Sequence, residues 1–193
     1  DNVQLINLKE FPIQGISSNS IEADKTYEID TLILATGFDA MTGALTSIDI
    51  IGRGGAKLKD QWESGAKSYL GLGIANFPNL FTVTGPGSPS VLSNMMPSIE
   101  QHVNWITDCI DWMETNDKKV IESSKTAEDE WMVLVNEIAD MTIFTDTKSW
   151  YNGSNIDSKA KAFLPFIGVP MYAEMLEEVV TEDFKGFIFD RPN

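Results

Sequence analysis

Two short apolar runs that each lead into glycine constrain the fold of this chain most. Residues 31–35 read T-L-I-L-A and precede Thr36 and Gly37, and residues 80–84 read L-F-T-V-T and precede Gly85. Continuous apolar runs bounded by glycine are typical of strands that are buried on both faces of an α/β sheet. Ligand sites in such sheets lie at the C-terminal ends of the strands. We therefore predict an α/β fold with a site at these two strand ends.

The remaining pattern predicts a small β meander followed by a helical region. Val3 and Leu5 alternate with polar neighbours, and short strands are expected at residues 13–16, 20–23 and 26–29. The frequent glycines between residues 39 and 77 indicate loops and short strands that connect two domains. No repeat is visible.

Three helices are predicted after residue 97. Ser98 and Gln101 have the spacing of a capping box. A second helix is expected from Thr126 and a third after Pro170, and residues 145–165 between them form a long polar loop. The apolar stripes expected to face the core are Ile99, Val103, Ile106 and Ile110 in the first helix, Trp131, Leu134, Val135 and Ile138 in the second, and Tyr172, Met175, Leu176 and Val179 in the third.

Charge and cysteine content exclude several kinds of partner. The 193 residues include 29 acidic and 14 basic side chains, a net charge of -15, so we expect no nucleic acid and no anionic membrane as partners. Cys109 has no second cysteine for an internal disulfide, and with His102 as the only histidine we expect no metal cluster. A cytoplasmic location fits this composition, and no apolar run has the length of a membrane span.

The second strand end is the better candidate for a binding site. The helix that follows residues 85–90 would direct N–H groups and a positive dipole at a carbonyl or an anion, such as the pyrimidine side of a reduced flavin. However, no G-x-G-x-x-G, G-x-S-x-G, P-loop, H-E-x-x-H or C-x-x-C motif is present, so the chain has no cradle for a dinucleotide pyrophosphate. His102 is expected to be packed or on the surface, and Glu177–Glu178 and Asp129–Glu130 are expected to be solvated. Trp150 lies in a polar loop, where it could bind a ligand or anchor the loop.

Five segments in order resemble type I Baeyer–Villiger monooxygenases. They are D-T-L-I-L-A-T-G-F-D-A at 30–40, N-F-P-N-L-F at 76–81, G-P-G-S-P-S-V-L-S-N-M at 85–95, S-I-E-Q-H-V at 98–103 and K-S-W-Y-N-G-S-N at 148–155. The G-P-G-S-P-S form is closer to the phenylacetone enzymes of this family than to the cyclohexanone enzymes. The resemblance implies that the chain is a C-terminal portion of a larger protein with an FAD domain and an NADP domain.

This resemblance assigns domains and site residues. Residues 1–38 would be the last segment of the NADP-binding domain, and residues 39–193 the C-terminal part of the FAD-binding domain with its helical region. The catalytic arginine of the family would lie upstream, because neither Arg53 nor Arg191 stands in a sequence context that matches the family's motifs. No catalytic residue is therefore expected here. The remaining assignments are Met95 beside the flavin, Trp150 on the NADP, Thr36 and Gly37 at the domain junction, and Ser90, Val91, Leu92 and Leu164 in the ketone pocket.

The implied function is the use of NADPH and O₂ to convert ketones to esters or lactones through a flavin C4a-peroxide, with FAD and NADP as cofactors. The isolated fragment is expected to be inactive. Two alternatives remain open at this point: a flavin monooxygenase that oxidises nitrogen or sulfur, and an acidic binding module without catalysis.

Overall fold

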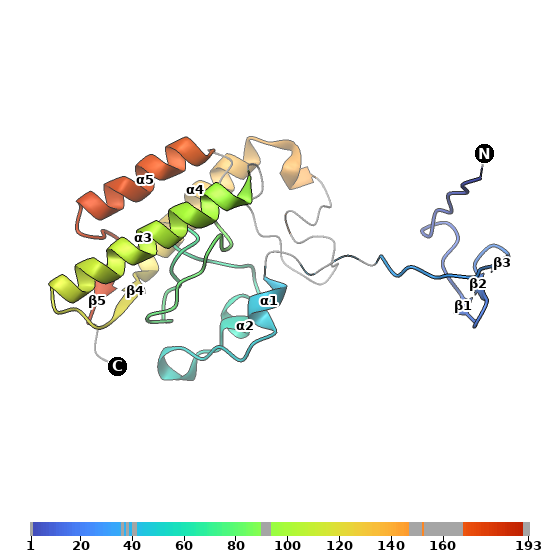
Figure 1. Ribbon diagram of the computed structural model, residues 1–193, viewed down its shortest axis with the longest axis horizontal. Coiled ribbons are helices and arrows are strands. Elements are labelled where there is room, and N and C mark those ends of the chain that lie inside the picture. The colour runs from blue at the N-terminus through green and yellow to red at the C-terminus, as the bar shows by residue number, and fades with distance from the viewer. Residues whose placement is uncertain are drawn as a thin grey trace. The chain divides into compact units, whose positions relative to one another are not determined.

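The computed structural model describes residues 2–35, 37, 39, 42–89, 94–146, 152 and 168–190, which fall into two compact units, Asp1–Gly37 and Phe38–Asn193 (Figure 1). The first unit contains the expected meander of three antiparallel strands: β1 (Gly15–Ile16), β2 (Ser20–Glu22) and β3 (Thr26–Glu28). Ile21 pairs with Tyr27 in its register. None of the described side chains of this unit is fully buried, and no strand forms at Val3 and Leu5.

The predicted buried strand at residues 31–35 is wrong for this structure. These residues are extended without a ladder partner, and Ile33 and Leu34 are 81% and 71% exposed. A strand is stable only when a neighbouring strand takes up its N–H and C=O groups. No segment in the described part of the chain does so here.

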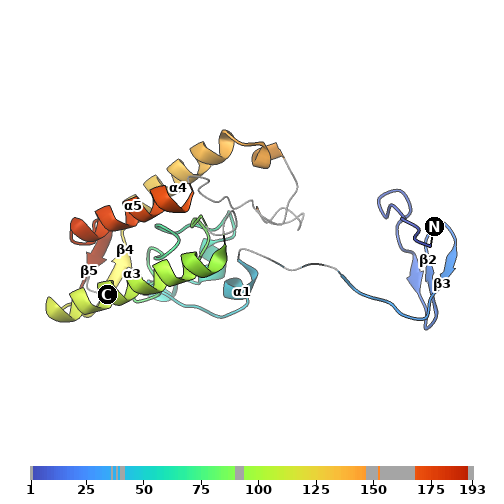
Figure 2. The same ribbon diagram turned by 45° about the horizontal axis from the view of Figure 1, so that its top comes forward.

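The second unit is built around three long helices. They are α3 (Met95–Thr115), α4 (Lys125–Asp140) and α5 (Val169–Thr181), with α3 packed against α5 (Figures 1 and 2). The antiparallel pair β4 (Ile121–Ser123) and β5 (Phe187–Phe189) lies near the C-terminal end of α3. The shorter elements are α1 (Gly43–Thr46), η1 (Arg53–Gly55), α2 (Leu58–Gln61) and η2 (Ile143–Asp146). Among the described residues, no helix combines the length and apolar character needed to cross a membrane.

The second predicted strand, at residues 80–84, is also wrong. Phe81 forms only an isolated bridge with Gly73, which itself bridges to Tyr69. Residues 69–81 therefore form an irregular hairpin whose apolar side chains enter the core, including Leu70, Leu72 and Ile74. Leu70 and Leu72 pack in one cluster with residues of the three helices and of β4 and β5, whereas Ile74 packs in a second cluster with Leu58 of α2.

Helices α3 and α4 each begin earlier than the sequence suggested, because other residues cap them. Asn94 caps α3 by accepting a hydrogen bond from the Met96 N–H, and Ser124 caps α4 by accepting one from the Ala127 N–H. Ser98 is consequently inside α3 and not at its start. Caps of this type take up N–H groups that have no acceptor within the helix.

The buried face of α3 is rotated by one residue from the expected face. Val103 and Ile110 are 47% and 44% exposed, whereas the buried residues are Ser98, His102, Trp105, Cys109 and Met113. The faces of α4 and α5 are largely as predicted, with Trp131, Val135, Tyr172, Leu176 and Val179 buried. The core thus includes polar side chains from α3. The spacing of apolar residues alone could not predict this.

Two buried carboxylates, on β4 and α4, connect these elements to η1 and to the hairpin. The Glu122 carboxylate on β4 accepts a hydrogen bond from Arg53 Nε at 2.7 Å, and both side chains are almost fully buried. Glu128 in the first turn of α4 accepts one from the Ala75 N–H at 3.1 Å. Such bonds offset part of the cost of burying a carboxyl group. These contacts hold the hairpin and η1 in place.

We expect Trp105→Ala to destabilise the protein far more than Val103→Ala, although both residues lie on α3. Trp105 is 5% exposed and contacts Phe184 and Phe187, so its removal should lower the free energy of unfolding by about 3–5 kcal/mol. Val103→Ala should cost less than about 1 kcal/mol because the side chain is half exposed. Urea unfolding monitored by circular dichroism measures both values. Equal losses would show that the face of α3 is assigned incorrectly.

Candidate functional site

A buried loop at residues 85–89 leads from the core hairpin toward the start of α3. Its carbonyl groups are taken up by side chains from two different elements. The Ser68 hydroxyl donates to the Pro86 carbonyl at 2.5 Å, and the Trp131 indole N–H donates to the Gly87 carbonyl at 3.0 Å. Because a buried carbonyl without a partner is costly, these two bonds fix the path of the loop.

Two loop positions require glycine for different reasons. Gly87 has φ +89°, a conformation that side chains rarely adopt, and a Cβ there would lie 2.9 Å from Ser68 Oγ. A Cβ on Gly85 would lie 2.4 Å from Thr82 Oγ1 and 2.7 Å from the Gly71 carbonyl. The glycines found in the sequence therefore serve close packing of the loop onto the core.

His102 on α3 bonds to the beginning of this loop. Its Nδ1 accepts a hydrogen bond from the Thr84 N–H at 2.9 Å, and its Nε2 lies 2.8 Å from the Tyr172 hydroxyl on α5. The Tyr172 hydroxyl donates to the Leu70 carbonyl at 2.5 Å. These partners assign a neutral imidazole with its proton on Nε2. Burial lowers the pKa of His102 to about 4, which agrees with a neutral ring.

The N-terminus of α3 has donors that the protein does not use. Met96 N–H is capped by Asn94, and Pro97 has no N–H, which leaves the N–H of Met95 as a first-turn donor without an acceptor among the described residues. Ser98 is 4% exposed, yet its hydroxyl has no hydrogen-bond partner. The first turn of α3 carries no acidic residue. This end of α3 can therefore bind a carbonyl group or a delocalised negative charge.

Gln101 adds an acceptor close to the same helix end. Its Oε1 is buried and has no hydrogen-bond partner. Gln101 lies three residues beyond Ser98, so the two side chains are neighbours on the helix surface. Both side-chain atoms are covered by protein atoms in this structure, so a ligand would meet them only after the covering groups move.

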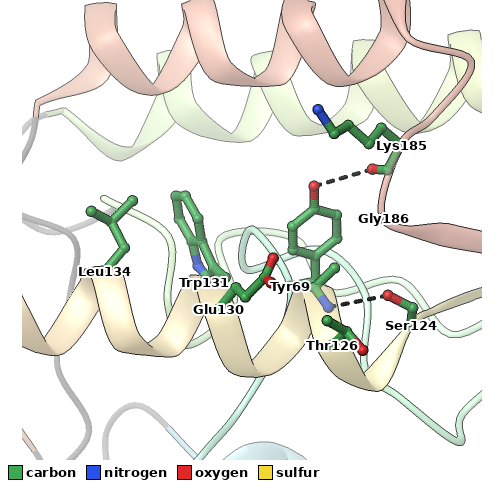
Figure 3. Close-up of a pocket in the computed structure, with 9 residues that line it drawn as sticks. Tyr69, Ser124, Thr126, Glu130, Trp131, Leu134, Lys185 and Gly186 are labelled. Carbon is green, nitrogen blue, oxygen red and sulfur yellow. Dashed lines mark hydrogen bonds between the residues drawn. The ribbon is translucent and has the colours of Figure 1, made fainter.

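A groove elsewhere in the second unit has a volume of about 350 Å³ and is shown in Figure 3. It lies between the first turns of α4, Tyr69 and the Lys185–Gly186 segment. The Tyr69 hydroxyl donates to the Lys185 carbonyl at 3.1 Å, and burial with Glu130 nearby raises the pKa of Tyr69 to about 12. Tyr69 is therefore a poor acid or base, so this groove offers no reactive group. The N-terminus of α3 is the stronger candidate site.

The structure describes only two of the site residues predicted from sequence. Met95 is half-buried in the first turn of α3, and Gly37 is exposed with φ +81°. His102 is packed, as expected, and Glu177 and Glu178 are exposed. The other predicted residues lie outside the described part of the chain: Thr36, Ser90, Val91, Leu92, Trp150 and Leu164.

Sequence reasoning missed the residues that hold the loop. Trp131 is buried as predicted, but its bond to Gly87 joins segments 44 residues apart and leaves no local pattern. Ser68 carries no signal, because isolated serines are common in loops. The clue that was available for His102 is its helical spacing from Ser98 and Trp105 on the same face of α3. A histidine on a buried face needs hydrogen-bond partners for both ring nitrogens.

Known proteins match this chain over nearly its full length. Curated relatives include a phenazine N-monooxygenase of Lysobacter antibioticus and a cyclohexanone 1,2-monooxygenase of Acinetobacter sp, each 40% identical over 190 residues, and a Baeyer–Villiger monooxygenase of Pseudooceanicola batsensis, 39% identical over 194 residues. These matches cover 97%, 97% and 99% of this chain but only 35% of each relative. No protein-family model matches the sequence.

Solved structures match equally well. A closed crystal structure of cyclohexanone monooxygenase has a TM-score of 0.93 at 38% identity and covers 99% of this chain and 36% of that one. An oxidised steroid monooxygenase bound to NADP has a TM-score of 0.87 at 39% identity, with 98% and 35% covered. The chain is thus similar in sequence and fold to Baeyer–Villiger-type and related monooxygenases, and it spans about a third of their length. The resemblance seen in the motifs is confirmed.

We expect His102→Asn to reduce the loss of stability in mild acid. The unfolded chain binds a proton at its ordinary histidine pKa of 6.5, whereas the folded chain does so only near 4, so stability falls as the pH drops from about 7 toward 4. The loss from this one group is at most about 3 kcal/mol.

Urea unfolding of both proteins at several pH values between about 7 and 5 measures the effect. The pKa of Glu128 is raised by burial, which has the opposite sign, but this carboxyl is present in both proteins and cancels in the comparison. Parallel curves for the two proteins would contradict the neutral state of His102.

Proposed function

We propose that this chain forms part of a monooxygenase that binds FAD and uses NADPH and O₂ to convert ketones to esters or lactones. The observation that carries the proposal is the end of α3 beside a buried glycine loop, where the Ser98 hydroxyl is unpaired and the Met95 N–H has no acceptor among the described residues. The similarity to Baeyer–Villiger-type monooxygenases over the whole chain supports it.

The residues at this helix end fit a flavin ring. The pyrimidine part of the ring presents carbonyl oxygens and an N–H, which are complementary to the donors at Met95 and Ser98 and to the free Oε1 of Gln101. When bound, FAD supplies hydride acceptance from NADPH and the reaction with O₂. The helix end would stabilise negative charge on the reduced ring, and the buried loop would exclude water.

Several site assignments remain proposals. We place Ser90, Val91 and Leu92 in the ketone pocket with Leu164 opposite them, Trp150 on the NADP, and Thr36 and Gly37 at the junction of two domains. Residues 1–38 would belong to the NADP-binding domain and residues 39–193 to the FAD-binding domain. These assignments follow from the matching motifs in the sequence.

The exposed apolar surface supports a role as part of a larger catalytic unit. The first unit buries no described side chain completely, and the apolar residues 31–35 have no ladder partner. Short strands without a buried face are not stable alone. Because the chain also has no G-x-G-x-x-G motif, we propose that further segments supply the pyrophosphate sites and that these 193 residues are inactive by themselves.

Oxidation of a nitrogen atom is a second candidate function. The phenazine N-monooxygenase relative is as similar to this chain as the cyclohexanone 1,2-monooxygenase, with 40% identity for each. The free donors at the end of α3 would serve the flavin equally in both reactions. The choice between a ketone and an aromatic nitrogen therefore depends on the substrate pocket.

The experiment that tests the proposal is an assay of the protein expressed from the complete source gene. We expect a yellow protein that retains FAD and oxidises NADPH faster when a cyclic or aryl ketone is added, with an ester or lactone as product. Turnover of phenazine with N-oxide formation and no ketone oxidation would favour the second candidate. A colourless protein without NADPH oxidation would overturn both and leave the acidic binding module.

We expect Ser98→Ala to weaken FAD binding in that protein by about five- to tenfold, because the flavin loses one hydrogen bond in a buried site. Ser123→Ala is the matched control, since the Ser123 hydroxyl is also buried without a partner but lies on β4. Fluorescence titration of the apoprotein with FAD measures both affinities. If the two variants bind FAD equally, Ser98 does not contact the flavin.

A further inference from the structure

His102 and Tyr172 connect the loop to two helices at a single buried point. His102 lies on α3, Tyr172 on α5 and Thr84 at the beginning of the loop, and the two ring side chains are 0% and 1% exposed. The hydrogen bonds run from the Thr84 N–H to His102, from His102 to the Tyr172 hydroxyl, and from Tyr172 to the Leu70 carbonyl. Every polar atom of this chain of bonds therefore has a partner.

The bond to Thr84 fixes a strained residue. Thr84 has φ +51° and Leu70 has φ +60°, both in the left-handed region that residues other than glycine seldom adopt. Such conformations persist only where surrounding contacts hold them. The backbone of Thr84 is held by His102 and that of Leu70 by Tyr172, so the same pair restrains both strained residues.

The position of His102 on α3 relates this bond to the functional site. His102 lies about two turns beyond Met95 on the same helix, and the loop that begins after Thr84 leads back to that helix end. Fixing Thr84 against His102 therefore sets the start of the loop at a defined distance from the first turn of α3. A shift of Thr84 would move the Gly87 carbonyl, which is bonded to Trp131.

We propose that His102 and Tyr172 are positioning residues that hold the buried loop and the N-terminus of α3 in the geometry that binds the flavin. The proposal rests on the function proposed above for the end of α3. A histidine suits the role because one rigid ring carries an acceptor for Thr84 and a donor for Tyr172. Phenylalanine provides neither group, whereas asparagine provides an acceptor near the position of Nδ1.

The first test measures hydrogen exchange in the 193-residue chain by NMR. We expect His102→Phe to speed exchange of the Thr84 amide and of the Trp131 indole N–H by about tenfold, because both protons belong to the network that holds the loop. His102→Asn should restore slow exchange at Thr84. The Ile121 amide, which bonds to Asn79, should not change relative to the rest of the chain.

A control for general loss of stability is Cys109→Ala. Cys109 lies on the same buried face of α3, and burial raises the pKa of its thiol to about 12, so it is a neutral packing residue. This variant should speed exchange uniformly and not selectively at Thr84 and Trp131. An equal pattern in Cys109→Ala and His102→Phe would overturn the proposal.

The second test uses the protein from the complete gene and measures FAD affinity and the midpoint potential of the flavin. We expect His102→Phe and Tyr172→Phe to weaken FAD binding about tenfold and to shift the potential, with His102→Asn closer to the unchanged protein. A lower melting temperature with unchanged affinity and potential would show a purely structural role and overturn the proposal.

These results separate the two hypotheses. If the unchanged protein binds no flavin, the proposed function fails, whereas the exchange pattern still decides whether His102 fixes the loop. If the unchanged protein binds flavin and the variants bind it equally, the proposed function stands and the positioning role fails.

Discussion

The need to satisfy the backbone of a buried loop governs the second unit of this protein. Residues 85–89 are removed from water, so their carbonyl groups require donors from the protein itself. Ser68 and Trp131 provide these donors, and His102 accepts the N–H of Thr84 where the loop begins. The three side chains come from different parts of the chain, so the loop is fixed only when α3, α4 and the segment that carries Ser68 have packed together.

The same arrangement supports the binding site that we propose at the end of α3. In the first turn of α3, Asn94 pairs with the Met96 N–H and Pro97 has no N–H, so the Met95 N–H remains as a donor. The Ser98 hydroxyl and the Gln101 Oε1 have no hydrogen-bond partner. Unpaired polar groups in a core reduce stability unless a ligand pairs with them. The helix end thus pairs poorly within the protein and is well suited to a ligand with both acceptors and a donor.

The two units differ in how far they are complete. The second unit has a core of apolar side chains and two buried carboxylates, Glu122 and Glu128, that tie its segments together. The first unit has a short meander whose described side chains remain accessible. A sheet that buries no apolar face gains little from the hydrophobic effect, so its stability has to come from neighbours. This agrees with the finding that the chain spans about a third of the length of its relatives.

The sequence by itself determined the elements whose signals are local. The meander and the three long helices follow from alternation, from the 3.6-residue period and from polar residues near the helix starts, and the motifs were sufficient for the resemblance to Baeyer–Villiger monooxygenases. Only the tertiary structure decided whether residues 31–35 and 80–84 form strands, because a strand depends on a partner that is distant in sequence. It also decided which face of α3 is buried. His102 enters the core because Thr84 and Tyr172 pair with both ring nitrogens, and such long-range partners leave no pattern in the sequence.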